Sequence, residues 1–157
     1  MGALPPGRNV SLENGAAGTG PAVVISPQDT RAQIAAVLRQ LTTRLGAEAA
    51  LLVSRDGLPV AVEMAGQAPG EADAWAAATA TLASLAEQLS EASGCGEMEA
   101  AVFRAERCWF SLRPLPVGFL AVMAKHEVPA QEMEAASVAI RRATHRLASA
   151  EGKRGRG

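Results

Sequence analysis

The chain has 157 residues, which is enough for one domain of ordinary size and no more. Apolar residues make up 48% of it and aromatic residues only 3%, so its core has to be aliphatic and rich in alanine. The net charge of −1 argues against a general affinity for nucleic acid, because phosphate binding needs a clear basic excess.

Signals for export or membrane attachment are missing from the sequence. The first ten residues contain no apolar core of signal-peptide length. The myristoylation pattern fails because Pro6 stands where Ser or Thr is required. No apolar run approaches the roughly 20 residues of a membrane span. These features predict a cytoplasmic protein that does not insert into a membrane.

Residues 1–25 are predicted to form a disordered tail, because Gly and Pro break every periodicity. The sequence Ser26-Pro27-Gln28-Asp29 then predicts the start of a helix, with Ser26 as its cap and Pro27 at its first position. The apolar stripe of this helix consists of Ile34, Val37, Leu38, Leu41 and Leu45. Gly46 is a natural stop.

Residues 49–64, with the sequence AALLVSRDGLPVAVEM, contain two apolar runs separated by Arg55-Asp56-Gly57. Asp-Gly between apolar runs is one of the strongest short hairpin signals, because Gly adopts a positive φ without a Cβ clash. Helix-patterned segments flank this hairpin on both sides. We therefore expect the hairpin to begin a sheet that helices cover.

A second, alanine-rich helix is predicted over about residues 71–93. One of its faces carries a heptad-like seam of Trp75, Ala78, Leu82, Leu85 and Leu89. Another face carries the small residues Ala76, Ala80 and Ala83, which would let a second backbone approach closely. Two interpretations stay open: a core helix with a solvated alanine face, or a helix buried by its own sheet on one side and by a partner on the other.

Three further strands are predicted at 97–104, 108–113 and 119–124, followed by a helix over about 130–150 and a loose basic tail at 151–157. The runs at 49–53 and 119–124 are apolar on both faces, which places them in the middle of a covered sheet. The strand at 59–64 begins with proline and the strand at 97–104 carries two glutamates, and both are features of edge strands.

The sequence contains no complete pattern for catalysis, cofactor binding or metal binding. Position 21 is Pro where a phosphate-binding loop needs Lys, and His126-Glu127 lacks the second His of a zinc-protease helix. Cys95 and Cys108 are too few for a disulfide framework, and each is interpreted as a small buried filler. The sequence therefore predicts a protein that is not an enzyme and that holds no cofactor.

The order of helix, apolar strand, Ser-Arg-Asp-Gly, apolar strand and long alanine-rich helix resembles the Roadblock / dynein-light-chain family, over roughly residues 28–148. The resemblance implies an α/β (α+β) domain at 26–150 with the chain order α-β-β-α-β-β-β-α. Its five-stranded antiparallel sheet, with strands numbered along the chain, has the order 2-1-5-4-3. The middle helix covers one face, and the two terminal helices cover the other.

The resemblance also implies a non-enzymatic module that works beside small Ras-like GTPases. Bacterial single-domain relatives pair with such a GTPase and stimulate its hydrolysis as homodimers, so the nucleotide and Mg²⁺ belong to the partner. The leading hypothesis is a homodimeric GTPase regulator or scaffold. One alternative is a structural adaptor with no effect on a nucleotide cycle. Another is a small-molecule sensor of the PAS or GAF kind, which the scarcity of pocket-lining residues disfavours.

The dimer is predicted to join through the edge strand at 97–104 and the alanine face of the second helix. The residues assigned to this interface are Ala76, Ala80, Ala83, Met98, Ala100 and Val102. Six acids and no Lys or Arg lie between positions 65 and 103, and those assigned to partner binding are Glu71, Asp73, Glu87 and Glu91. Arg55 and Arg107 are expected at sheet ends, away from this helix, and not to act as arginine fingers.

Overall fold

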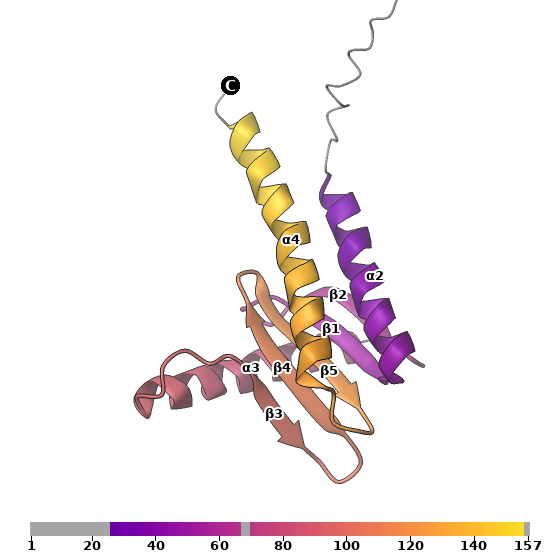
Figure 1. Cartoon of the computed structure of the whole chain (residues 1–157), viewed down its shortest axis with the longest axis vertical. Coiled ribbons are helices and arrows are strands. Elements are labelled where there is room, and N and C mark those ends of the chain that lie inside the picture. Colours follow the sequence, from indigo (N-terminus) through magenta and orange to yellow (C-terminus); the bar gives the residue numbers. More distant parts are fainter. Residues whose placement is uncertain (1–25, 67–69, 156–157) are drawn as a thin grey trace, which may run out of the picture.

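Five antiparallel strands form one sheet with helices on both of its faces (Figure 1). The structure, a computed structural model, describes residues 26–66 and 70–155. The elements are α2 (Pro27–Leu45), β1 (Ala49–Val53), β2 (Pro59–Met64), α3 (Glu71–Ala92), β3 (Ala101–Arg104), β4 (Trp109–Leu115), β5 (Gly118–Ala124) and α4 (Ala130–Arg154). The predicted tail at 1–25 and the end of the basic tail lie outside the described residues.

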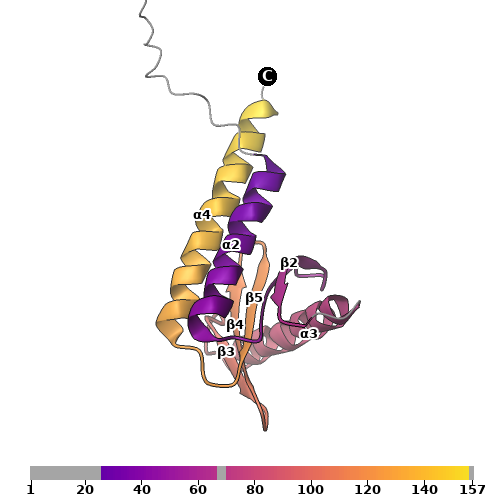
Figure 2. The same cartoon turned by 90° about the vertical axis from the view of Figure 1, so that its right-hand side faces the viewer.

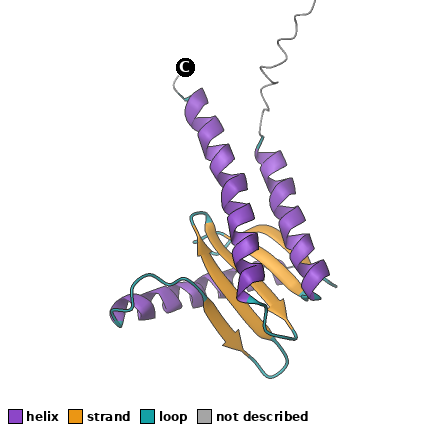
Figure 3. Cartoon of the chain, in the orientation of Figure 1, coloured by secondary structure: helices purple, strands orange, loops and turns teal. Residues whose placement is uncertain are grey.

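The strand order is β2-β1-β5-β4-β3, so the predicted order and both predicted edge strands are confirmed. Seen from the side, α2 and α4 run together along one face of the sheet and α3 crosses the other (Figure 2). Leu52 and Leu120 belong to the core under α2 and α4, whereas Leu51 and Phe119 belong to the core under α3. Successive residues of a strand point to opposite faces, which is why β1 and β5 read as continuous apolar runs. Figure 3 shows the same layers by type of element.

The N-terminus of α2 is closed by a capping box. Ser26 Oγ accepts a hydrogen bond from the Asp29 N–H at 3.1 Å, and Asp29 Oδ2 accepts one from the Ser26 N–H at 3.2 Å. The Ser26 hydroxyl also donates to Asp29 Oδ2 at 2.8 Å. These bonds from the Ser26 side chain and backbone lower the pKa of the Asp29 carboxyl below its ordinary 3.8.

Replacing Ser26 with Ala should lower the free energy of unfolding at neutral pH by about 1 kcal/mol, a typical loss for a helix cap. A lowered folded pKa contributes stability above the unfolded pKa, and this contribution is lost as the pH falls through the folded pKa. The loss caused by Ser26→Ala should therefore shrink once the pH falls below 3.8. Urea denaturation at neutral and acid pH measures both values. Thr43→Ala, at an exposed site in the same helix, is the control. An equal loss at both pH values would contradict the role of Asp29.

Two element boundaries differ from the sequence prediction by four residues each, and the others by no more than two. β3 begins only at Ala101, so residues 97–100 are not part of the ladder. Pro114 on the neighbouring β4 has no N–H to donate to a longer β3, which accounts for β3–β4 pairing that stops at Leu112. At the other end of the chain, α4 continues to Arg154, so the first four residues of the predicted loose tail are helical. Ala148, Ala150 and Glu151 are strong helix formers that carry the helix across Gly152.

Candidate interaction surface

The small-residue face of α3 packs on the protein's own sheet. Ala76 and Ala83 are fully buried and Ala80 is 6% exposed, in one core cluster with Leu51, Val53 and Phe119. The large buried side chains between α3 and the sheet come from the strands. The helix contributes alanines there and therefore lies close to the sheet. The three alanines therefore cannot form the partner contact that the sequence analysis assigned to them, and that assignment is corrected.

The opposite face of α3 carries an apolar stripe, which we call the leucine stripe. It consists of Leu82, Leu85 and Leu89, whose exposed fractions are 39%, 57% and 70%. A helix turns about 100° per residue, so this spacing puts the three side chains on one side, roughly opposite the buried alanines. Contiguous exposed apolar surface of this kind marks a site of interaction. The heptad-like seam of the sequence therefore faces outward beyond Trp75, which packs on Phe110 at a ring-centroid distance of 5.9 Å.

The edge strand β3 extends this apolar surface beyond the helix. Phe103, which points to the α3 face of the sheet, is 50% exposed, whereas its neighbour Val102, which points to the opposite face, is 54% exposed. The Phe103 ring lies 5.6 Å from that of Phe110, which in turn contacts Trp75, so a row of aromatic rings joins the edge strand to α3. Ala100 and Val102 are exposed beside the open edge, whereas Met98 is half-buried and lines a groove.

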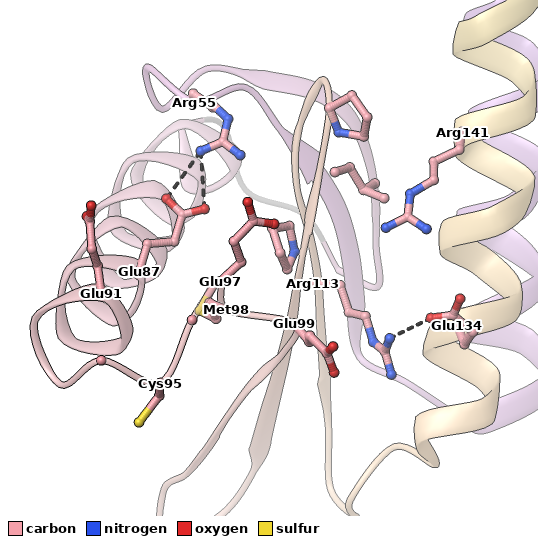
Figure 4. A pocket seen from close by; sticks show the side chains of 15 residues that line it. Arg55, Glu87, Glu91, Cys95, Glu97, Met98, Glu99, Arg113, Glu134 and Arg141 are labelled. Atoms are coloured by element: carbon pink, nitrogen blue, oxygen red, sulfur yellow. Dashed lines mark hydrogen bonds and ion pairs between the residues drawn. The ribbon is translucent and has the colours of Figure 1, made fainter.

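That groove, of about 1310 Å³, lies between the C-terminal end of α3, the loop at 94–99, the β4–β5 turn and α4 (Figure 4). Two ion pairs cross its walls. Arg55 Nη1 lies 3.2 Å from Glu87 Oε2, and Arg113 Nη1 lies 2.5 Å from Glu134 Oε2. The charged groove residues outside these pairs are Glu91, Glu97, Glu99 and Arg141. We call this region the acidic groove, because three of those four side chains are acids.

The four acids assigned to partner binding are thus divided between the two ends of α3. Glu71 and Asp73 lie in its first turn, where acids complement the helix dipole. Glu87 and Glu91 line the acidic groove at the other end. The structure does not bring the four acids together into one patch.

Arg55, in the turn between β1 and β2, contacts α3. The expectation that this arginine lies away from the helix is therefore wrong. Besides its ion pair with Glu87, its guanidinium sits 4.9 Å from the centroid of the Phe119 ring. No local pattern signals this contact, because Arg55 and Glu87 are 32 residues apart.

The turn that carries Arg55 is held by short local bonds. Ser54 Oγ donates to Asp56 Oδ1 at 2.5 Å and accepts from the Leu58 N–H at 3.0 Å. The Ser54 bond, followed by a backbone bond at Asp56 itself, lowers the pKa of the Asp56 carboxyl. Gly57 closes the turn at a φ of 87°, and a Cβ there would lie 3.3 Å from the Cα of Ala77. The sequence Ser-Arg-Asp-Gly therefore docks the hairpin directly on α3.

The two cysteines do not behave alike. Cys95 is exposed in the loop after α3, so its interpretation as a buried filler is wrong, while Cys108 is half-buried. Among residues 26–66 and 70–155, no group of three or more His, Cys, Asp or Glu side chains could hold a metal ion. In the same part of the chain, no helix has both the length and the apolar character needed to cross a bilayer.

The comparisons with known proteins agree on a domain family and a fold. A family model described as the Roadblock/LC7 domain matches residues 33–124. No curated protein matches the chain in sequence. The gliding protein MglB from Thermus thermophilus is similar in structure, with 22% identity, a TM-score of 0.66, and coverage of 74% of this chain and 92% of that one.

Two further solved structures show the same likeness. MglB from Myxococcus xanthus is 17% identical, with a TM-score of 0.69, and the match covers 80% of this chain and 96% of that one. A Roadblock/LC7 domain from Streptomyces avermitilis is 24% identical, with a TM-score of 0.61 and coverage of 73% and 97%. At these identities the likeness is one of fold.

Proposed function

Because the chain belongs to the Roadblock/LC7 domain family, whose model matches more than half of it, we propose that it is a homodimeric regulator or scaffold for a small Ras-like GTPase. The observation that carries the proposal is the apolar surface formed by the leucine stripe and the open β3 edge. A domain that leaves three leucines and an edge strand uncovered on one side has a surface that a partner can bury.

The proposed dimer joins two β3 edges about a two-fold axis and packs the two leucine stripes together. An edge strand has unpaired N–H and C=O groups along its outer side, and pairing two such edges makes one continuous sheet. In an isologous contact each leucine stripe meets its own copy, so no complementary surface elsewhere on the chain is required. Val102 keeps the interface role that the sequence analysis gave it, and the leucine stripe replaces the three buried alanines.

The GTPase partner supplies the nucleotide, the Mg²⁺ and the phosphate-binding loop in this proposal. The acids of α3, with Asp73 at one end and Glu91 at the other, are proposed to meet a basic surface of the partner and to orient its approach. Regulation is proposed to act by clamping the switch loops of the GTPase rather than by inserting an arginine. The position of Arg55 supports this mechanism, because its guanidinium already holds Glu87 and covers the Phe119 ring.

Single-turnover GTP hydrolysis tests the function, with any Ras-like GTPase found encoded next to this gene as the partner. We expect the protein to bind the GTP-loaded partner and to accelerate its hydrolysis, and to turn over no nucleotide alone. Binding without acceleration would favour the adaptor alternative. Absence of binding to any neighbouring GTPase would refute the proposal.

Arg55→Ala should leave the stimulated rate within about threefold of the wild-type rate, with Arg107→Ala as the matched control in the other exposed turn. An arginine finger contributes roughly 10³ to 10⁵ in rate, so the two mechanisms are easily separated. A loss of two orders of magnitude or more in Arg55→Ala, with affinity for the partner unchanged, would show that the finger exists.

A further inference from the structure

The C-terminal half of α4 projects beyond the sheet together with the N-terminal half of α2 (Figures 1 and 2). Its exposed bases share one face of the helix. Arg142, Arg146 and Lys153 are spaced by four and seven residues, which aligns them to within about 40° at 100° per residue. Glu151 falls on the opposite side of the helix. We call these three residues the basic stripe.

Within the described part of the chain, no acid neutralises any of the three bases of this stripe. Arg146 donates to the side chain of Gln33 at 3.0 Å and to the backbone oxygen of Arg142 at 3.3 Å, and both acceptors are uncharged. Arg142 and Lys153 are exposed, and neither belongs to any of the five ion pairs among the described residues. The stripe therefore presents three positive charges on one face of α4.

The acidic groove supplies the opposite charge and a concave shape. The stripe of α3 that packs on the sheet through Ala80 and Ala83 continues at the same helical spacing into Glu87 and Glu91. These acids therefore face the groove rather than the leucine stripe. Glu97 and Glu99 approach from the loop at 94–99 together with the apolar Met98 (Figure 4). Pro114 and Pro116 also line the groove.

Within one chain the basic stripe cannot enter this groove. Arg141 lines the groove, and the basic stripe lies about 120° further around α4, at 100° per residue. Among the described groove residues, Arg141 is also the one base without an ion-pair partner, since Arg55 and Arg113 are paired with Glu87 and Glu134. Glu91, Glu97 and Glu99 thus keep a net negative charge beside Arg141. The complementary surfaces can meet only between different copies of the chain.

We propose that the basic stripe of one copy docks into the acidic groove of another, which builds assemblies larger than the dimer. The contact is heterologous, so it either closes into a ring or extends by repetition. The net charge of −1 removes the long-range repulsion that would keep copies apart. The groove and the leucine stripe lie on opposite sides of α3, so the same copy can make both contacts.

Light scattering of the full chain without any GTPase tests this contact. The Debye length is roughly 30 Å at about 0.01 M salt and roughly 3 Å at about 1 M. High salt should therefore dissociate the assembly but not a dimer held by apolar contacts. We expect the mean mass at low salt to be at least about twice that at high salt. The high-salt species is the reference whether it is a dimer or a monomer, so the outcome is independent of the proposed function.

Two charge-reversed variants identify the surfaces. Arg142→Glu with Lys153→Glu reverses the stripe, and Glu97→Lys with Glu99→Lys reverses the groove. Each variant alone should stay at its high-salt mass in low salt, and an equimolar mixture of the two should assemble again. Circular dichroism checks that both are folded. A wild-type mass that does not change with salt, assembly by either variant alone, or no assembly of the mixture would overturn the proposal.

Discussion

Gly118→Ala should reduce the free energy of unfolding by at least about 4 kcal/mol. Single substitutions cause losses of this size only through severe steric or electrostatic defects. A Cβ at this position would lie 1.9 Å from the carbonyl oxygen of Val53 and 2.9 Å from the Cα of Ser54. Both are backbone atoms, of β1 and of the turn that follows it, so neither can move aside as a flexible side chain would. The φ of 148° adds strain for any residue with a Cβ.

Urea denaturation of Gly118→Ala and of a matched glycine variant measures this effect. Gly152 lies within α4, with nothing within 4 Å of its hypothetical Cβ, so Gly152→Ala should raise stability by up to about 1 kcal/mol. Since domains of this kind are stable by only about 5–15 kcal/mol, the Gly118 variant should be visibly destabilised at room temperature. A loss below about 1 kcal/mol would mean that β1 and β5 are less closely packed than the structure shows.

The elements that could be predicted from sequence are those set by local chemistry. The capping box at Ser26 and the Asp-Gly turn fix the start of α2 and the hairpin within their own few residues. The unbroken apolar runs of β1 and β5 placed them at the sheet centre, because only doubly covered strands have no polar face. The Roadblock resemblance supplied the same strand order.

The site was harder to predict. The wrong predictions concern which face of an element contacts which neighbouring element. Both the leucine and the alanine faces of α3 have the period of a buried helix, and sequence cannot say which of them the sheet takes. The large side chains that fill the space, such as Leu51 and Phe119, come from strands elsewhere in the chain. The contact between Arg55 and Glu87 depends likewise on how α3 crosses the sheet, which no local pattern encodes.

The two faces of α3 also separate dimer formation from folding. Leu85→Arg should leave the domain folded but dissociate the proposed dimer. Leu85 is 57% exposed, so the substitution should change folding stability by no more than about 0.5 kcal/mol. Across a two-fold axis, however, it sets two cations against each other in an apolar contact. We expect the dimer dissociation constant to rise at least 100-fold, which corresponds to roughly 2.7 kcal/mol.

Ala80→Arg should destabilise the fold, whereas a substitution at an interface position would dissociate the dimer and leave each copy folded. Ala80 is 6% exposed beneath the sheet, so arginine there has to bury an unpaired charge or push α3 away, at a cost of about 4 kcal/mol or more. Circular dichroism melting should show an unfolded or strongly destabilised chain, whereas sedimentation should show Leu85→Arg as a folded monomer. Gln88→Arg, at an exposed site to one side of the leucine stripe, adds the same charge and should remain a folded dimer. A folded, monomeric Ala80→Arg beside a dimeric Leu85→Arg would mean that the alanine face meets the partner after all, and that the leucines pack on the sheet.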